Sequence, residues 1–418
     1  MATTKKAKPA PVTNALTESV EVLRALFKSK KMSDPFVTLD EDDFMQSLPH
    51  IPTGSIMLDY LMGGKLNQYG VPPCPGFPKG KVINLYGQES SGKTTVALMV
   101  AANVIAAGGT VLYIDWENAI VPAYAKTLGV PINDKIHFML SQPDTLEQGI
   151  SSIWVVVNRG IDLVVIDSVG AGVPKAVMEQ ALDEKGAAGR VGASAQIWST
   201  MLPQIRSKII KTGTCVVGIS QLRSTINTSG YGDATSSQAQ GGNAWKFYSD
   251  IRFGLRRIKT EKSKEYDVMA HSSSEEVTTG AKVRARADKC KVSAMQGREV
   301  EFYLKHGEGV DDLRSVIEFA QRHGIVKKDG SWYGWEKADG SSIRLQGREA
   351  FQEAVRSNPD AAAELRRLTI SRLYASDACV PEDDKGVEEE ALDIESILSA
   401  GELPAKGAKA VPDGEEEA

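Results

Sequence analysis

Cysteine and long apolar runs are both scarce in this sequence. The four cysteines lie far apart among 418 residues and form no CxxC pair, which argues against a disulfide framework or a cysteine-based zinc site and favours a reducing cytoplasm. The longest apolar run, residues 96–107, is interrupted by Asn103 and is shorter than the ~18–20 residues that a membrane-spanning helix needs. No apolar segment follows the N-terminal lysines, so neither a secretory signal nor a membrane partner is expected.

The composition is otherwise that of an ordinary globular protein, with 42% hydrophobic and 25% charged residues. The length corresponds to about two to three domains. The net charge of −5 is unevenly distributed, because residues 381–418 contain 13 acidic residues and 3 lysines, a net of −10, which leaves +5 for residues 1–380. Such a tail either competes with nucleic acid for a basic body or only keeps the protein soluble, and composition does not distinguish the two.

The most informative stretch is a glycine-rich turn between an apolar strand at 82–86 and a helix that includes residues 96–102. The turn consists of Gly87, Gln88, Glu89, Ser90, Ser91, Gly92, Lys93, Thr94 and Thr95, and it matches the GxxxxGK[ST] pattern of a phosphate-binding loop. In such a loop the backbone N–H groups and the helix N-terminus converge on a polyphosphate. Lys93 is expected to bind the β- and γ-phosphates, and the Thr94 hydroxyl to coordinate Mg²⁺. The sequence therefore predicts a nucleotide site.

Strands and helices alternate after this loop. The pattern predicts strands at 110–115, 137–141, 163–167 and 215–220, and helices at 121–128 and 144–158. Continuous apolar strands separated by helices indicate a parallel sheet covered on both faces, with ligands at the carboxyl ends of the strands. Asp167 ends one strand and is expected to hold the magnesium shell. Glu117, just past another strand, either polarises the attacking water or is a surface carboxylate.

Three segments outside this alternation also carry a prediction. Apolar residues at 16, 20, 23 and 27 predict an amphipathic helix that ends near Met32 and packs either on a neighbouring subunit or on its own core. The Pro-rich residues 71–78 are predicted to form a surface loop. Residues 225–242 are almost entirely small and polar, which is typical of a loop that becomes ordered on a ligand.

Several of these motifs together resemble the bacterial RecA recombinases. They follow one another in the family's order, from about residue 53 to about residue 372, at 85–95, 114–119, 141–145, 165–169, 174–176 and 241–248. Several are longer and more specific than the phosphate loop itself. The resemblance implies an α/β fold: a RecA-like P-loop NTPase core with a mostly parallel sheet, an N-terminal helical arm and a small α+β C-terminal domain. The implied domains are an arm at 1–45, the ATPase core at 46–310, a DNA-gathering domain at 311–378 and an acidic tail at 379–418.

The resemblance also implies a role for several residues of the nucleotide site. Glu117 matches the catalytic glutamate, and Tyr124 matches the aromatic residue that stacks on adenine. Gln221 matches the glutamine that senses the γ-phosphate and relays its presence to the DNA loops. Lys289 and Lys291 match a lysine pair that reaches the neighbouring subunit's nucleotide. Because they are two residues apart on a predicted strand, both side chains are expected on one face; contact with solvent or with the DNA backbone is the alternative.

The DNA contacts implied by the resemblance lie in the stretches after Lys175 and after Gln221, which match two loops that hold single-stranded DNA. The candidate DNA-binding residues are Arg190, Arg223, Gly241, Gly242, Asn243, Lys246, Arg284 and Arg286. Cations that flank a polar loop are suited to phosphate groups. Arg284 and Arg286 alternate on a predicted strand face and contact either a second, double-stranded DNA or solvent.

The chain also departs from the family pattern. Val121 stands where the family usually has an aspartate near adenine, and Gln196 where an arginine faces DNA, a role that Arg190 is placed to take. The aromatic patch at 331–335 in the C-terminal domain is expected to be core rather than a base-stacking surface.

The expected function is that of an ATP-dependent recombinase that polymerises on single-stranded DNA as a helical filament and exchanges strands with double-stranded DNA, with ATP and Mg²⁺ as cofactors. A RecA-fold hexameric helicase or motor is the main alternative, and a non-catalytic scaffold is a third. The roughly 50 residues before Pro52 are too few for the separate N-terminal domain that the helicase interpretation needs. The intact Lys93, Thr94, Glu117 and Asp167 argue against a scaffold.

Overall fold

The computed structural model describes residues 15–32, 34, 36, 46–68, 70–180, 192–226, 235–239, 242–267 and 272–375. The chain consists of two units, Met1–Met45 and Gln46–Ala418. The first unit contains the expected amphipathic helix, α1 (Ala15–Ser29), in which Leu16, Val22 and Leu26 are exposed. The acidic tail that begins at residue 379 lies outside the described residues.

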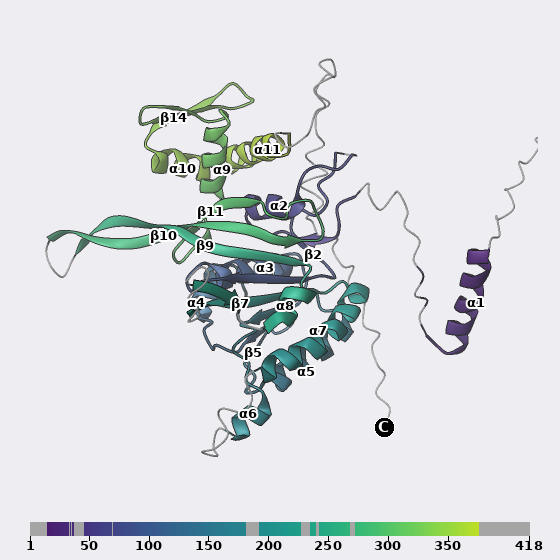
Figure 1. Cartoon of the computed structure of the whole chain (residues 1–418). Coiled ribbons are helices and arrows are strands. Elements are labelled where there is room, and N and C mark those ends of the chain that lie inside the picture. Colours follow the sequence, from purple (N-terminus) through teal and green to yellow (C-terminus); the bar gives the residue numbers. More distant parts are fainter. Residues whose placement is uncertain are drawn as a thin grey trace, which may run out of the picture. The chain divides into compact units, whose positions relative to one another are not determined.

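The second unit is built on a ten-stranded sheet, as far as the described residues show (Figure 1). Its strand order is β12-β11-β10-β9-β3-β7-β6-β4-β5, and β8 pairs with β7 away from this path. The pairs from β9 to β5 are parallel, and the others are antiparallel. The strands are β3 (Val82–Gly87), β4 (Val111–Asp115), β5 (Phe138–Ser141), β6 (Leu163–Asp167), β7 (Cys215–Ile226), β8 (Thr235–Ala239), β9 (Ile251–Asp267), β10 (Ser272–Cys290), β11 (Glu299–Lys305) and β12 (Gly309–Val310).

Both faces of the parallel strands are buried, as their continuous apolar runs predict. Along β6, Leu163 and Val165 belong to one core cluster, and Val164 and Ile166 to the other. Helix α3 (Lys93–Ala106) packs in the first cluster, whereas α5 (Leu146–Arg159), α7 (Ala193–Thr212) and α8 (Gly242–Tyr248) pack in the second. The expected α/β fold is therefore confirmed. None of the helices within the described ranges is both long and apolar enough to cross a membrane.

Helix α5 shows how local chemistry sets these boundaries. The Thr145 hydroxyl accepts from the Gln148 backbone N–H, and the Gln148 side chain accepts from the Thr145 backbone, a capping box that satisfies two donors of the first turn. The helix ends at Gly160, whose φ of 79° is the left-handed conformation that glycine adopts most readily. The shorter helices of the core are α2 (Ile56–Gly63), α4 (Pro122–Thr127) and α6 (Lys175–Gln180).

Two pairs of strands extend beyond the main sheet. β3 pairs only with residues 251–255 of β9, and β11 only with residues 280–286 of β10, so residues 262–267 of β9 and 272–278 of β10 form a two-stranded ribbon (Figure 1). β7 continues past Gln221 to Ile226 and pairs with β8. The segment 225–242, which was predicted to be a loop, therefore contains strand residues at 225–226 and 235–239. This differs from the expectation because ladder hydrogen bonds use the backbone and need no apolar side chains.

The Pro-rich segment 71–78 is not a surface loop, so this prediction was wrong. Cys74 and Phe77 are fully buried, and Cys74 Sγ donates a hydrogen bond to the Gly76 carbonyl (3.3 Å). The last two residues form β2 (Phe77–Pro78), which pairs with β1 (His50–Ile51). Proline and glycine mark chain reversals, and here the reversal lies against the core rather than in solvent.

The C-terminal region carries a smaller sheet and three helices. These elements are α9 (Asp312–Arg322), β13 (Lys327–Asp329), β14 (Trp332–Glu336), β15 (Ser342–Gln346), α10 (Arg348–Arg356) and α11 (Pro359–Ala375). The three strands are antiparallel. Tyr333 and Trp335 are buried, as expected for core aromatics, but Trp332 is 43% exposed and Arg344 lies over its ring. Side chains alternate between the faces of a strand, and position 332 points outward.

Candidate nucleotide site

The glycine-rich turn has the backbone geometry of a phosphate-binding loop. A Cβ atom at Gly87 would lie 2.2 Å from the Leu255 carbonyl oxygen, and Gly92 has a φ of 89°, so both positions require glycine. Lys93 begins α3, is 7% exposed, and donates from Nζ to the carbonyls of Gly87 (3.1 Å) and Gln88 (2.7 Å). The cation is therefore held inside the loop that it is predicted to serve.

Thr94 and Asp167 lie together at the carboxyl ends of the strands. Thr94 Oγ1 donates to Asp167 Oδ2 (2.8 Å), and the buried Tyr113 hydroxyl donates to the same oxygen (2.9 Å). Burial raises the pKa of Asp167, and these two hydrogen bonds oppose that shift. Burial likewise lowers the pKa of Lys93, while Asp167 and Glu117 act in the opposite direction. A hydroxyl and a carboxylate that share one edge fit Mg²⁺, which takes few protein oxygens and completes its shell with phosphate and water.

Glu117 is held by residues from two other strands. Gln221 Nε2 donates to Glu117 Oε1 (2.9 Å) and Oε2 (3.2 Å), and the Ser168 hydroxyl donates to Oε1 (2.5 Å). Asp115, at the end of β4, accepts from the backbone N–H groups of Ala119 and Ile120 (both 3.2 Å) and so fixes the turn that carries Glu117. The structure thus brings together two predicted residues that lie 104 positions apart in the sequence.

Sequence reasoning missed three contributors to this site: Tyr113, Asp115 and Ser168. Each is buried, with at most 5% of its surface exposed. A polar residue inside or next to an apolar strand end was the available signal, because buried polar groups need partners. Their partners became identifiable only when the strand order was known.

Tyr124 lies on α4 next to the phosphate loop. Its hydroxyl is hydrogen-bonded to Thr95 Oγ1 (2.8 Å), and its ring packs against the core. Val121, the N-cap of α4, is 59% exposed. The contact with Thr95 places the tyrosine where the first turn of α3 begins; its stacking on adenine stays a prediction.

Lys289 and Lys291 do not lie on one strand, so the alternation argument was wrong. β10 ends at Cys290 and has an irregularity just before Lys289. Lys289 Nζ donates to the Lys246 carbonyl (3.3 Å), and Lys291 Nζ lies 3.7 Å from Asp250 Oδ1. Burial, followed by the charge of Lys291, lowers the pKa of Lys289. The irregularity precedes both lysines and β10 ends between them, so strand alternation does not determine how the two side chains are oriented.

The candidate DNA-binding residues fall into three groups. Arg190, Gly241 and the Arg223 side chain lie outside the described residues. Gly242, Asn243 and Lys246 form the exposed face of α8. Arg284 and Arg286 are exposed on β10, as predicted, but both are already paired with carboxylates.

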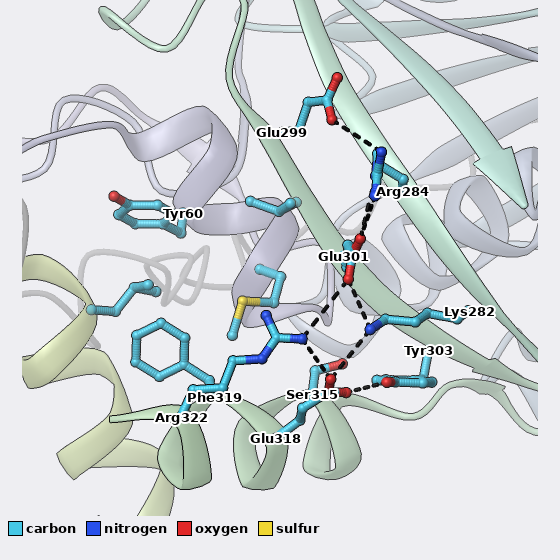
Figure 2. A pocket seen from close by; sticks show the side chains of 13 residues that line it. Tyr60, Lys282, Arg284, Glu299, Glu301, Tyr303, Ser315, Glu318, Phe319 and Arg322 are labelled. Carbon is cyan, nitrogen blue, oxygen red and sulfur yellow. Dashed lines mark hydrogen bonds and ion pairs between the residues drawn. The ribbon is translucent and has the colours of Figure 1, made fainter. Parts of the chain in front are cut away.

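Arg284 lies between Glu299 and Glu301 of β11, at the rim of a cavity of about 510 Å³ (Figure 2). These pairs are largely solvent-exposed, and exposed ion pairs typically contribute only about 0–1 kcal/mol. Arg286 Nε likewise lies 3.2 Å from Asp288 Oδ1. Phosphate groups would therefore have to compete with these carboxylates for the two arginines.

Comparisons with known proteins match the same family along most of the chain. A family model of the RecA N-terminal domain matches residues 25–311, and one of the RecA C-terminal domain matches residues 314–373. Protein RecA of Frankia alni is 37% identical over 346 residues, which is 81% of this chain and 90% of the relative. Protein RecA of Pseudarthrobacter chlorophenolicus is 37% identical over 79% of this chain and 84% of its own length. Protein RecA of Caulobacter vibrioides is also 37% identical, over 76% of this chain and 79% of its own length.

Proposed function

Because this chain belongs to the RecA family, we propose that it is an ATP-dependent recombinase that forms filaments on single-stranded DNA and catalyses homologous pairing and strand exchange. The contact that carries this proposal is the one between Glu117 and Gln221. It joins a carboxylate beside the nucleotide site to the strand that leads into residues 227–241. Two hydrogen bonds thus join the candidate nucleotide site to the strand that leads to the candidate DNA-binding segment.

The hydrolytic step uses groups from three strand ends. The backbone of residues 87–92 and the Lys93 ammonium bind the phosphates, where positive charge stabilises the charge that develops on transfer. Thr94 Oγ1 and Asp167 would hold Mg²⁺, which supplies charge neutralisation when bound. Glu117 orients the attacking water by accepting its hydrogen bond, since its other contacts come from an amide and a hydroxyl that only donate to it.

Gln221 would report the state of the nucleotide to the DNA-binding segment. Its amide can donate to Glu117, as in this structure, or to an oxygen of the γ-phosphate, and the two acceptors compete for one side chain. A change of acceptor shifts β7 and therefore the start of residues 227–241. ATP acts as the switch if this shift changes the affinity for DNA.

The filament requires contacts between copies of the chain, and β5 offers one surface. It is the edge strand of the sheet, with β4 as its one neighbouring strand within the described part of the chain. Met139 of β5 is 53% exposed, and Ile136, two residues before the strand, is 80% exposed. Exposed apolar edges readily accept a further strand. We propose that the N-terminal unit of a neighbouring copy packs there, since α1 also presents exposed apolar residues.

The variant Gln221→Ala tests the proposal. The ratio of the hydrolysis rate with single-stranded DNA to the rate without it should fall at least tenfold. Affinity for a non-hydrolysable ATP analogue should persist because the phosphate loop lies on β3 and α3. Gln204→Ala is the matched control, because Gln204 is exposed on α7 and its amide donates to the Thr200 carbonyl of the same helix (3.2 Å). An unchanged ratio in Gln221→Ala would contradict the proposed relay.

Electron microscopy of the wild-type protein with single-stranded DNA and the same analogue distinguishes the alternatives. An extended helical filament is expected for a recombinase, whereas closed rings would favour the helicase or motor. No observation on the described residues favours the ring.

A further inference from the structure

Three tryptophans form a column inside the second core cluster, beneath the carboxyl ends of the parallel strands. Trp116 and Trp198 meet edge to face with ring centres 6.2 Å apart, and Trp198 and Trp245 meet edge to face at 5.2 Å. Trp198 and Trp245 are at most 1% exposed. Edge-to-face aromatic pairs at these distances are attractive and directional.

Glu117, Ser168 and Gln221 form the Glu117 cluster, and the column touches the chain within three residues of each of them. Trp116 directly precedes Glu117. Trp198 Nε1 donates to the Val169 carbonyl (3.1 Å), and Val169 directly follows Ser168, which bonds Glu117. The Trp245 ring lies on the backbone of β7 three residues before Gln221, because a Cβ at Gly218 would lie 2.2 Å from it.

The other side of the column belongs to the two helices that follow the candidate DNA-binding segments. Trp198 lies on α7, which begins just after residues 181–191, and Trp245 lies on α8, which begins just after residues 240–241. The two helices also touch directly, since a Cβ at Gly242 would lie 2.7 Å from Ala195 Cβ.

The packing around the rings leaves little room for independent movement. A Cβ at Gly149 would lie 2.2 Å from Trp116 Cζ2, and one at Gly172 would lie 3.1 Å from Trp116 Cε2. Close-packed interiors respond to displacement as units rather than by continuous deformation. A shift of α7 or α8 would therefore be passed to the Glu117 cluster.

Two of the three indole N–H groups are unsatisfied hydrogen-bond donors within the described part of the chain. Trp116 Nε1 and Trp245 Nε1 are buried and have no hydrogen-bond partner among the described residues. A buried donor without a partner destabilises the fold, and phenylalanine would fill much of the same space without one. Hydrogen bonding therefore does not explain why these two positions hold indoles rather than phenylalanine rings.

We propose that Trp116, Trp198 and Trp245 are positioning residues that couple the DNA-binding segments to Glu117, so that DNA bound beside α7 and α8 sets the geometry of the hydrolytic carboxylate. This inference rests on the proposed function, because it assumes that hydrolysis is stimulated by DNA. The column acts on Glu117 through its neighbours and touches no reacting atom.

The test compares Trp198→Leu, Trp198→Phe and the control Trp154→Leu. Trp154 lies half-buried on α5 at the same core cluster, outside the column, with Lys208 over its ring. For each folded variant, phosphate release is measured with and without single-stranded DNA over a range of ATP concentrations. DNA binding is measured with a non-hydrolysable analogue.

Trp198→Leu should lower the DNA-stimulated kcat at least tenfold, with the KM for ATP and the affinity for DNA changed less than twofold. Trp198→Phe, which keeps an aromatic edge, should recover at least a third of the stimulation, and Trp154→Leu should retain all of it. A merely structural role would lower the melting temperature of both leucine variants and leave the stimulation ratio unmoved. If Trp198→Leu does not fold, Trp116→Leu at the end of the column is read by the same criteria.

Three results would overturn the inference: normal stimulation in the column variant, equal loss in Trp154→Leu, or loss of DNA affinity that accounts for the lower rate. Failure of the proposed function looks different. In that case DNA does not stimulate the wild-type protein at all, whatever the variants do.

Discussion

Asp59 is expected to contribute less to the stability of this protein at alkaline than at acidic pH, and Asp59→Asn should remove that contribution. Asp59 lies on α2, where its Oδ1 accepts from the Thr53 backbone N–H (2.9 Å) and hydroxyl (2.8 Å). Burial raises the pKa of this carboxyl to about 7, although both hydrogen bonds and the charge of Arg366 oppose the shift. An asparagine offers the same Oδ1 acceptor without a charge.

The sign follows from proton uptake. The unfolded chain releases this proton near pH 4 and the folded protein near pH 7, so the folded state binds more protons between these values. The contribution of Asp59 to stability is therefore greatest below pH 4, declines as pH rises to 7, and is constant above. A difference of about three pKa units between the folded and unfolded states corresponds to at most ~4 kcal/mol in the free energy of unfolding. Because Asp59 keeps some solvent exposure, we expect roughly half, or ~2 kcal/mol.

Thermal denaturation of the wild-type protein and of Asp59→Asn at pH 5 and pH 8 measures the effect. Asp59→Asn should raise the melting temperature at pH 8 by about 3–6 °C for ~2 kcal/mol, and by clearly less at pH 5. Asp360→Asn, an exposed carboxyl in the first turn of α11, is the matched control and should show no such difference. Equal shifts at both pH values, or a lower melting temperature at pH 8, would refute the reasoning.

Three predictions concern function. Lys93→Ala should abolish ATP hydrolysis and strand exchange while circular dichroism shows an intact fold; normal strand exchange would refute the nucleotide assignment. Removing residues 381–418 takes away a net charge of −10, so filter binding should show tighter double-stranded DNA binding at 0.01 M salt that fades by 0.1 M, as the screening length falls from about 30 Å to about 10 Å; unchanged affinity at low salt would leave the tail a solubiliser. A double alanine variant of Lys289 and Lys291 should bind nucleotide but lose DNA-stimulated hydrolysis, and mixing it with Lys93→Ala protein should restore some activity; inactive mixed filaments, or normal hydrolysis by the double variant, would show that these lysines do not complete a shared site.

Much of the nucleotide site was predictable from sequence because its parts are contiguous. The phosphate loop needs one strand, one turn and one helix in succession, and the contiguous residues 82–102 encode all three. Asp167 was identifiable by the same logic, as the polar end of an apolar strand. The alternation of such strands with helices also predicted the parallel sheet, since burial on both faces demands continuous apolar runs.

Predictions failed where a side chain's surroundings come from distant segments. The Pro-rich residues 71–78 were expected in solvent, because composition signals a turn but not what lies over it. The predicted alternation of Lys289 and Lys291 on one strand failed because β10 ends between them, and residue type does not mark that boundary. Arg284 was identified as an exposed cation, but its partners on β11 depend on the register of β10 with β11.

The sequence by itself determined the local elements of this protein: the phosphate loop, the polar strand ends and the apolar strands, because each depends on neighbours within a few residues. Tertiary structure alone decided which of these ends meet. Glu117 follows β4 and Gln221 lies on β7, two strands that β6 separates in the sheet. Trp116, Trp198 and Trp245 come from segments whose successive members are about 50–80 residues apart. Strand order and helix packing set those contacts. Both minimise the free energy of the whole chain rather than that of any one segment.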